Sequence, residues 1–223
     1  MTPNDTIIQN TQNWLIRAVI GLNLCPFAKA VHVKNQIRYA VSAAVTTDEL
    51  AFELAQELAQ LAATPAHEVD TTLLIHPHVL TDFFDYNDFL SGADALLERM
   101  ELDGEIQIAS FHPDYLFADA PADDPSHCTN RSPYPMLHLL REASIDKAVK
   151  AYPDASMIYE KNIDTLNELG VDGWQKLLNN GAATARPPTL FENDEGRRVG
   201  SKIKMLCHIH DSYCVFGNCW YDE

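Results

Sequence analysis

The stretch that decides the fold is residues 37–76, IRYAVSAAVTTDELAFELAQELAQLAATPAHEVDTTLLIH. Along residues 37–45, the side chains at odd positions are apolar, while those at even positions are smaller or polar, and this alternation predicts a strand. Thr46, with Glu49 three residues later, resembles the capping box that starts a helix. The helix that follows places four leucines on one side: Leu50, Leu54, Leu58 and Leu61. A short apolar strand over 71–76 closes the segment, and a strand–helix–strand order predicts a crossover between parallel strands.

The rest of the first 180 residues continues this alternation. A helix is predicted over 6–22, and Thr81-Asp82 is expected to cap a helix that reaches Met100. A third strand is predicted over 105–112. Ser132, with Pro133 after it, predicts the start of a helix that runs to Ala151, and a last helix is expected over 162–178. The predicted order αβαβαβαα indicates the α/β class, with a small, mostly parallel sheet and flanking helices.

A change of composition near Gly181 divides the chain. We expect residues 1–181 to form the α/β domain and 182–223 to form a linker and C-terminal tail that the domain does not need for folding. Strand-like alternation of apolar and polar residues over 202–209, followed by a second short segment at 213–216, indicates a possible β-hairpin in the tail. The tail also carries residues of metal-ligand types, but their spacing matches no standard zinc module: Cys207, His208, His210, Cys214 and Cys219.

The charge of the chain excludes several partners. A formal net charge of −16 over 223 residues argues against binding nucleic acid or an anionic membrane, because phosphate contacts need clustered Lys and Arg. No targeting signal and no membrane-spanning run is visible. Five cysteines do not read as a disulfide framework. We therefore expect a cytoplasmic protein, and the oligomeric state stays open.

Two of the three predicted strands end in a histidine that a proline follows, His76 and His112. If the strands are parallel, both histidines lie at the edge of the sheet where ligands bind. Imidazole titrates near neutrality, so they are candidates for a general acid and base. The alternative is that each is a hydrogen-bonded residue at a strand end. With His78 they are weak candidates for metal ligands; a divalent metal stays open as a cofactor, and no nucleotide-cofactor motif is present.

The connection of about twenty residues after His112 is long for a compact domain, which is typical of a binding loop. Arg131 lies where the predicted helix begins, so we expect it to hold an anion at the positive end of the helix dipole. The alternative to an anion site is a structural role, in which Asn130 only forms a turn and Ser132 only caps the predicted helix. Further along that helix, Tyr134, His138 and Arg141 would share one stripe with Glu142, facing either the same pocket or solvent.

The candidate residues fall into two sets. The predicted catalytic residues are His76, His112, Asp114 and His138. The predicted substrate-binding residues are Tyr115, Asn130, Arg131, Ser132, Tyr134 and Arg141. Cys25, at the end of a predicted helix, is interpreted as a buried structural cysteine.

Several motifs also carry a resemblance to a family. They are NLCPFA at 23–28, TLLIHP at 72–77, DFFDYNDFL at 82–90, QIASFHPDYLF at 107–117 and TNRSPYPMLHLLRE at 129–142. The chain resembles, over roughly residues 10–180, an uncharacterised bacterial family known only as a domain of unknown function. The resemblance implies a shared site but no activity.

The interpretation that these features favour is a small cytoplasmic enzyme that performs acid–base or hydrolytic chemistry on a small anionic metabolite. Two alternatives stay open, so whether the protein is an enzyme at all is not decided. One is a non-catalytic binding or adaptor protein with an apolar patch at Phe83, Phe84, Tyr86 and Phe89. The other is a metal-handling protein that uses His76, His78 and His112.

Overall fold

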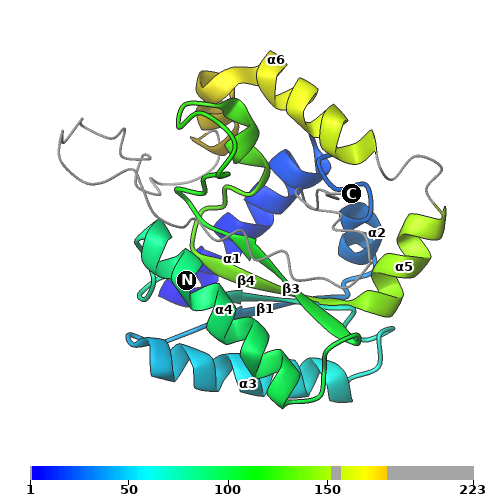
Figure 1. Ribbon diagram of the computed structural model, residues 1–223. Helices are drawn as coiled ribbons and strands as arrows, with labels where there is room; N and C mark the ends of the chain where they lie inside the picture. The colour runs from blue at the N-terminus through cyan, green and yellow to red at the C-terminus, as the bar shows by residue number, and fades with distance from the viewer. Residues whose placement is uncertain (1, 152–156, 180–223) are drawn as a thin grey trace, which may run out of the picture.

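The strands of the sheet lie in the order β1-β2-β4-β3 (Figure 1). The computed structural model describes residues 2–151 and 157–179. The strands are β1 (Ile37–Val41), β2 (Thr71–Ile75), β3 (Ile106–Phe111) and β4 (Met136–Arg141). The helices and helical turns are α1 (Pro3–Trp14), η1 (Leu15–Ile20), α2 (Ala28–Val33), α3 (Thr47–Ala63), α4 (Phe83–Arg99), η2 (Pro125–Thr129), α5 (Glu142–Ala151) and α6 (Ile158–Asn179).

The α/β class is confirmed, but the sheet is mixed rather than mostly parallel. β1 pairs with β2 in parallel, as the segment 37–76 predicts, with Ile37 opposite Thr71. β4 lies between β2 and β3 and is antiparallel to both. β2 and β3 therefore run in the same direction without pairing directly, and their carboxyl ends lie at the same edge of the sheet.

The prediction of a helix over 132–151 is wrong in its first half, which is the central strand β4. Leu137 and Leu139 are completely buried against α3 and α4, while Met136 faces the opposite layer. A strand covered on both faces has a nearly continuous apolar sequence, which periodicity does not separate from a helix. Helix α5 begins only at Glu142, so the predicted stripe of Tyr134, His138, Arg141 and Glu142 does not exist.

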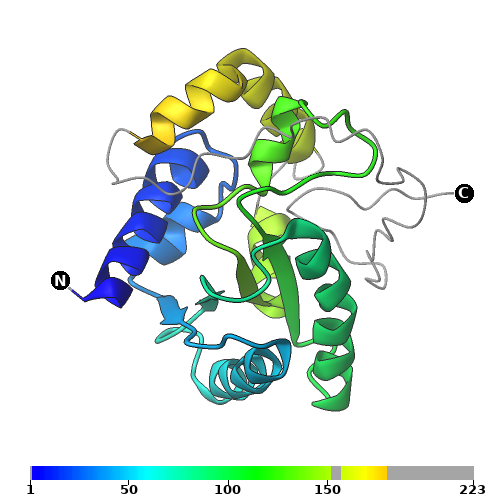
Figure 2. The ribbon, with the colours of Figure 1, turned by 90° about the vertical axis from the view of Figure 1, so that its left-hand side faces the viewer.

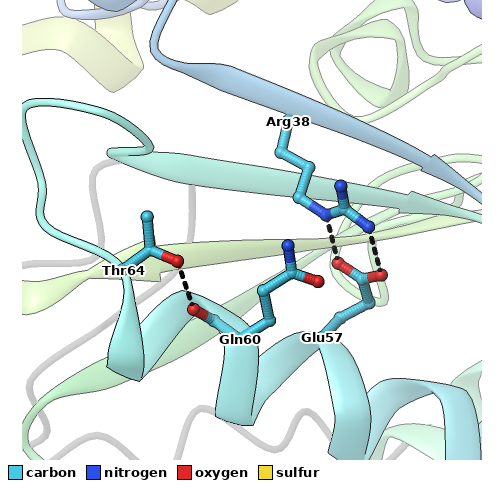
Figure 3. A network of polar contacts seen from close by, with 4 residues as sticks. All are labelled: Arg38, Glu57, Gln60 and Thr64. Carbon is cyan, nitrogen blue, oxygen red and sulfur yellow. Dashed lines mark hydrogen bonds and ion pairs between the residues drawn. The ribbon is translucent and has the colours of Figure 1, made fainter.

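The helix between β1 and β2 forms as its sequence predicts. The Thr46 hydroxyl accepts from the backbone N–H of Glu49 at 3.3 Å, and the Glu49 carboxylate accepts from that of Thr46 at 3.2 Å. The four leucines of α3 are buried against the sheet. On the same face, Arg38 of β1 makes a two-point ion pair with Glu57 of α3, at 2.7 and 2.8 Å (Figure 3). The ion pair holds α3 in register with the edge strand.

Two apolar layers cover the two faces of the sheet (Figure 2). One layer packs α3 and α4 against one face of the sheet, where the side chains of β2, β3 and β4 include Leu74 and Leu137. The other packs α1, η1 and α6 against the reverse face, including Leu73 and Phe111. In the described part of the chain, no helix combines the length and the apolar character that crossing a membrane requires. The predicted hairpin and the tail at 182–223 lie outside the described residues.

Candidate functional site

His76 and His112 come together at one edge of the sheet, on the face that α4 covers. Each directly follows its strand, β2 or β3. Both rings pack on Tyr86 of α4, with ring centroids 5.8 Å from His76 and 5.2 Å from His112. The prediction that the two histidines lie at one edge of the sheet is confirmed, although β4 lies between their strands.

The ring nitrogens of this pair hold the backbone of the connection between β2 and α4. A carbonyl only accepts, so Nδ1 of His76 donates to Val79 O at 3.0 Å, and Nε2 of His112 donates to Leu80 O at 3.3 Å. Nδ1 of His112 accepts from the backbone N–H of Asp114 at 3.0 Å. Of the four nitrogens, Nε2 of His76 has no hydrogen-bond partner in the described chain.

Burial keeps both imidazoles neutral. Both side chains have 0% exposure. Burial, together with the nearby His112 and against the hydrogen bond to Val79, lowers the pKa of His76 to about 4. Burial also lowers the pKa of His112, against an opposing effect of the Asp114 carboxylate. Both rings are thus buried and hydrogen-bonded at strand ends, as in the structural alternative that the sequence left open for each histidine.

The predicted anion site at Arg131 loses its helix dipole, because no helix begins at Ser132. Nε of Arg131 donates to the carbonyl of Tyr115 at 3.3 Å, across the base of the loop. The Trp14 indole donates to the carbonyl of Arg131 at 2.9 Å. Ser132 donates to the carbonyl of Tyr134 at 2.7 Å instead of capping a helix. Through these hydrogen bonds, Arg131 connects the loop to Tyr115 and to α1.

Asn130 and Tyr134 also tie the loop to the rest of the molecule. The side-chain amide of Asn130 donates to Ser110 O at 3.1 Å, and the Tyr134 hydroxyl accepts from Asn10 of α1 at 2.9 Å. His127, which sequence reasoning does not single out, is fully buried inside the same loop. Its Nε2 donates to a carbonyl of the loop, and its Nδ1 accepts from a backbone N–H. Both partners, Pro121 and Phe117, lie within its own loop, whose sequence shows no periodic pattern that would mark a buried residue.

His138 lies on the opposite face of the sheet from His76 and His112. Its Nε2 is 2.6 Å from the Thr71 hydroxyl, which also lies 2.7 Å from Leu139 O. The carbonyl takes the hydroxyl proton, so Nε2 of His138 is the donor of this hydrogen bond. Burial lowers the pKa of His138 to about 4. His138 is therefore a neutral imidazole in a fixed tautomer.

Arg141 closes the carboxyl end of α3. Its guanidinium donates to three backbone carbonyls, those of Leu61, Thr64 and Val69. These carbonyls include ones that the end of a helix leaves without an intrahelical partner. A structural role thus explains most of its donors, although the side chain also reaches the cavity described next.

A cavity of about 640 Å³ opens on the sheet face that carries His138. Its floor is formed by all four strands, β1 to β4, and its walls by α1, η1, α2 and α5. Figure 1 shows α2 and α5 on the same side of the sheet, and both contribute lining residues. The apolar lining includes Trp14, Leu15, Val19, Phe27, Val31, Leu73, Phe111, Leu140 and Ile145. The polar lining includes Lys34, Asp70, Thr71, His138, Arg141, Ser144 and Lys147. Of the predicted site residues, the cavity gathers His138 and Arg141.

Cys25 lies in the wall of this cavity as a buried free thiol. Burial raises its pKa to about 11, so it stays protonated at neutral pH. This fits the interpretation of Cys25 as a structural cysteine.

Among the described residues, no group of three or more metal-ligating side chains is arranged to hold a metal ion. His76 is buried while His78 is exposed, because the chain turns at Pro77. The cysteines and histidines of the tail lie outside the described residues.

The family model described as "Protein of unknown function (DUF1415)" matches residues 6–176. The chain belongs to this family. The match includes the whole sheet, the His76–His112 edge and every residue that lines the cavity of this DUF1415 protein. No curated protein and no solved structure matches the chain.

Proposed function

We propose that this DUF1415 protein binds a small molecule with an apolar body and an anionic group in the cavity between the sheet and α1, η1, α2 and α5. The observation that carries the proposal is the cavity itself, about 640 Å³ in volume and lined mainly by apolar side chains. Sites for small molecules have volumes of roughly 300–1,000 Å³, an apolar lining and a few polar groups that orient the ligand.

The charges around the cavity favour an anion. The lining contains the cationic side chains Lys34, Arg141 and Lys147, and one acidic side chain, Asp70. The whole chain has 16 basic residues against 32 acidic ones, so this local balance reverses the overall one. Lys34 and Lys147 are exposed, which places them where the cavity meets solvent. An acid could enter with its apolar part first and leave its charge beside these lysines.

Binding is better supported than acid–base catalysis. A general base works best with a pKa near the operating pH. Burial lowers the pKa values of His76 and His138 to about 4. The histidine pair at the sheet edge is fully buried on the other face of the sheet, away from the cavity. We therefore propose an anionic ligand without assigning a reaction to these imidazoles.

The first test of the proposal measures charge preference by calorimetry. Decanoate and 1-decanol are the probes, because they share an apolar chain and differ in charge. Decanoate should bind, and 1-decanol should bind more weakly. Lys147→Gln should weaken decanoate binding by up to about fivefold, the range for an exposed ion pair, and should leave 1-decanol unchanged. Lys150→Gln is the matched control, because Lys150 is exposed on the same helix but does not line the cavity.

The second test fills the cavity. Ala148→Trp places an indole among the lining residues of α5, and Ala143→Trp places one on the exposed side of the same helix. Decanoate binding should be lost in the Ala148 variant and retained in the Ala143 variant, with cooperative melts in both. Equal binding by the two variants, or no binding by the parent protein, would contradict the proposed function.

A further inference from the structure

The helix that forms one wall of the cavity changes its geometry where it meets the cavity. α1 is a regular helix as far as Trp14, and η1 continues it as a π-helical turn over Leu15–Ile20. The wider turn appears in its backbone hydrogen bonds, from Gly21 N–H to Ile16 O at 3.0 Å and from Leu24 N–H to Val19 O at 2.9 Å. Single π turns are rare in proteins, and those that occur are often located at functional sites.

Gly21 is required by this geometry for space. Its φ of −64° is ordinary for a helix, so no left-handed conformation calls for glycine. A Cβ atom at this position would lie 2.2 Å from the carbonyl oxygen of Arg17 and 3.0 Å from its carbonyl carbon. Both atoms belong to the backbone, so a side chain at position 21 forces the turn itself to move.

The π turn brings Trp14 and Val19 to the same side of the helix, facing the cavity. Trp14, Leu15 and Val19 all line it, while Ile16 is 45% exposed. At 3.6 residues per turn, positions 14 and 19 of a regular helix would point roughly 140° apart. A turn closed by hydrogen bonds from residue i to i+5 brings them to the same side. A regular helix would place Val19 beside Leu15, roughly 40° away, but not beside Trp14; the π turn aligns all three in one wall.

We propose that the π turn Leu15–Ile20 is the specificity-determining wall of the cavity, and that Val19 limits the length of the apolar chain that an anionic ligand can place there. This inference rests on the proposed function. It assigns the ligand class more closely, as acids whose apolar chain ends against η1. Gly21 is a positioning residue, because it acts only by allowing the turn.

The test compares two substitutions within the same turn. Binding of octanoate, decanoate, dodecanoate and tetradecanoate is measured for the parent protein, Val19→Ala and Ile16→Ala. Val19→Ala removes two methyl groups from the wall, so the preferred acid should become longer. Affinity should rise by about fourfold for each methylene that the new space admits. Ile16→Ala removes side-chain volume on the exposed side and should keep the length preference of the parent.

Gly21→Ala tests the turn itself. We expect it to change the length preference, because the added Cβ displaces the carbonyl of Arg17. Gly92→Ala in α4 is the matched control, since a Cβ there meets no atom within 4 Å. If Gly21→Ala does not fold, the Val19 and Ile16 pair decides alone. If the parent binds none of the acids, the proposed function fails; if acids bind with the same length preference in both of those variants, only this inference is overturned.

Discussion

Thr71 and His138 are joined by a 2.6 Å hydrogen bond between β2 and β4, on the floor of the cavity. The same Thr71 hydroxyl lies 2.7 Å from the carbonyl oxygen of Leu139, so one side chain satisfies two groups of the central strand. This arrangement fixes the tautomer of His138. It also links the floor of the proposed ligand site to the stability of the sheet.

Thr71→Val should destabilise the protein by about 1–3 kcal/mol, because it leaves a buried donor and a buried acceptor without their partner. Urea unfolding followed by circular dichroism measures this as a lower midpoint at an unchanged m-value. Thr165→Val is the control, since the Thr165 hydroxyl makes an exposed bond to Lys161 O within α6. An equal loss of stability in both variants would show that the Thr71–His138 bond has no special role.

Stability should fall as the pH drops from 7 toward 4. The folded pKa values of His76 and His138 are about 4, whereas an unfolded histidine titrates near 6.5. Between these values the unfolded state binds protons that the folded state excludes, so acidification favours unfolding. Each histidine contributes stability on the order of 3 kcal/mol that is fully present above about pH 6.5 and is lost toward pH 4.

Urea unfolding at pH 7, 6 and 5 measures this dependence. His76→Gln should reduce the loss of stability per pH unit, because it removes one of the buried histidines whose pKa is lowered in the folded state. His78→Gln, a change at the exposed neighbour, should keep the slope of the parent. A His76→Gln variant with the parent slope would mean that the folded protein protonates His76 freely.

Arg141→Met should lower stability by about 2 kcal/mol, because the carbonyls at the end of α3 lose a charged donor while the apolar stem is kept. Arg99→Met is the control, since Arg99 is exposed in the last turn of α4. Thermal melts of the two variants measure the difference. Weaker decanoate binding by Arg141→Met without any loss of stability would make Arg141 a ligand contact only.

Arg131→Ala should leave decanoate binding unchanged, because Arg131 does not line the cavity. It should cost about 1 kcal/mol of stability, the value of the hydrogen bond to Tyr115 that closes the loop. Calorimetry and urea unfolding of the same preparation measure both effects. Loss of decanoate binding in a variant of normal stability would return the anion site to Arg131.

The local part of the fold was predictable from the sequence. The capping pair Thr46 and Glu49 and the leucine stripe of α3 depend on residues three or four apart, so sequence spacing reveals them. The central strand β4 was not predictable, because MLHLLR at 136–141 fits a buried strand and a buried helix equally well. Its pairing with β2 joins residues more than sixty positions apart, such as Leu73 and His138.

The candidate site was predictable in part for the same reason. Two histidines at strand ends correctly indicated one edge of the sheet, but sequence does not show that both rings would be sealed by Tyr86 and the carbonyls of Val79 and Leu80. The cavity was missed, because its walls come from four helical segments between Trp14 and Ala151. Lys34 and Lys147 carry no local sign that they line the same cavity.

The most direct measurement of ligand binding in the cavity is a methyl-labelled NMR titration of the full chain with decanoate. If the ligand binds there, saturable chemical-shift changes should appear at methyl groups that line the cavity, such as those of Val19, Leu73 and Leu140. Methyl groups of Leu54 and Leu58, in the layer between the sheet and α3, should not move. Shifts confined to that layer, or no saturable shift at the cavity methyl groups, would contradict ligand binding in the cavity.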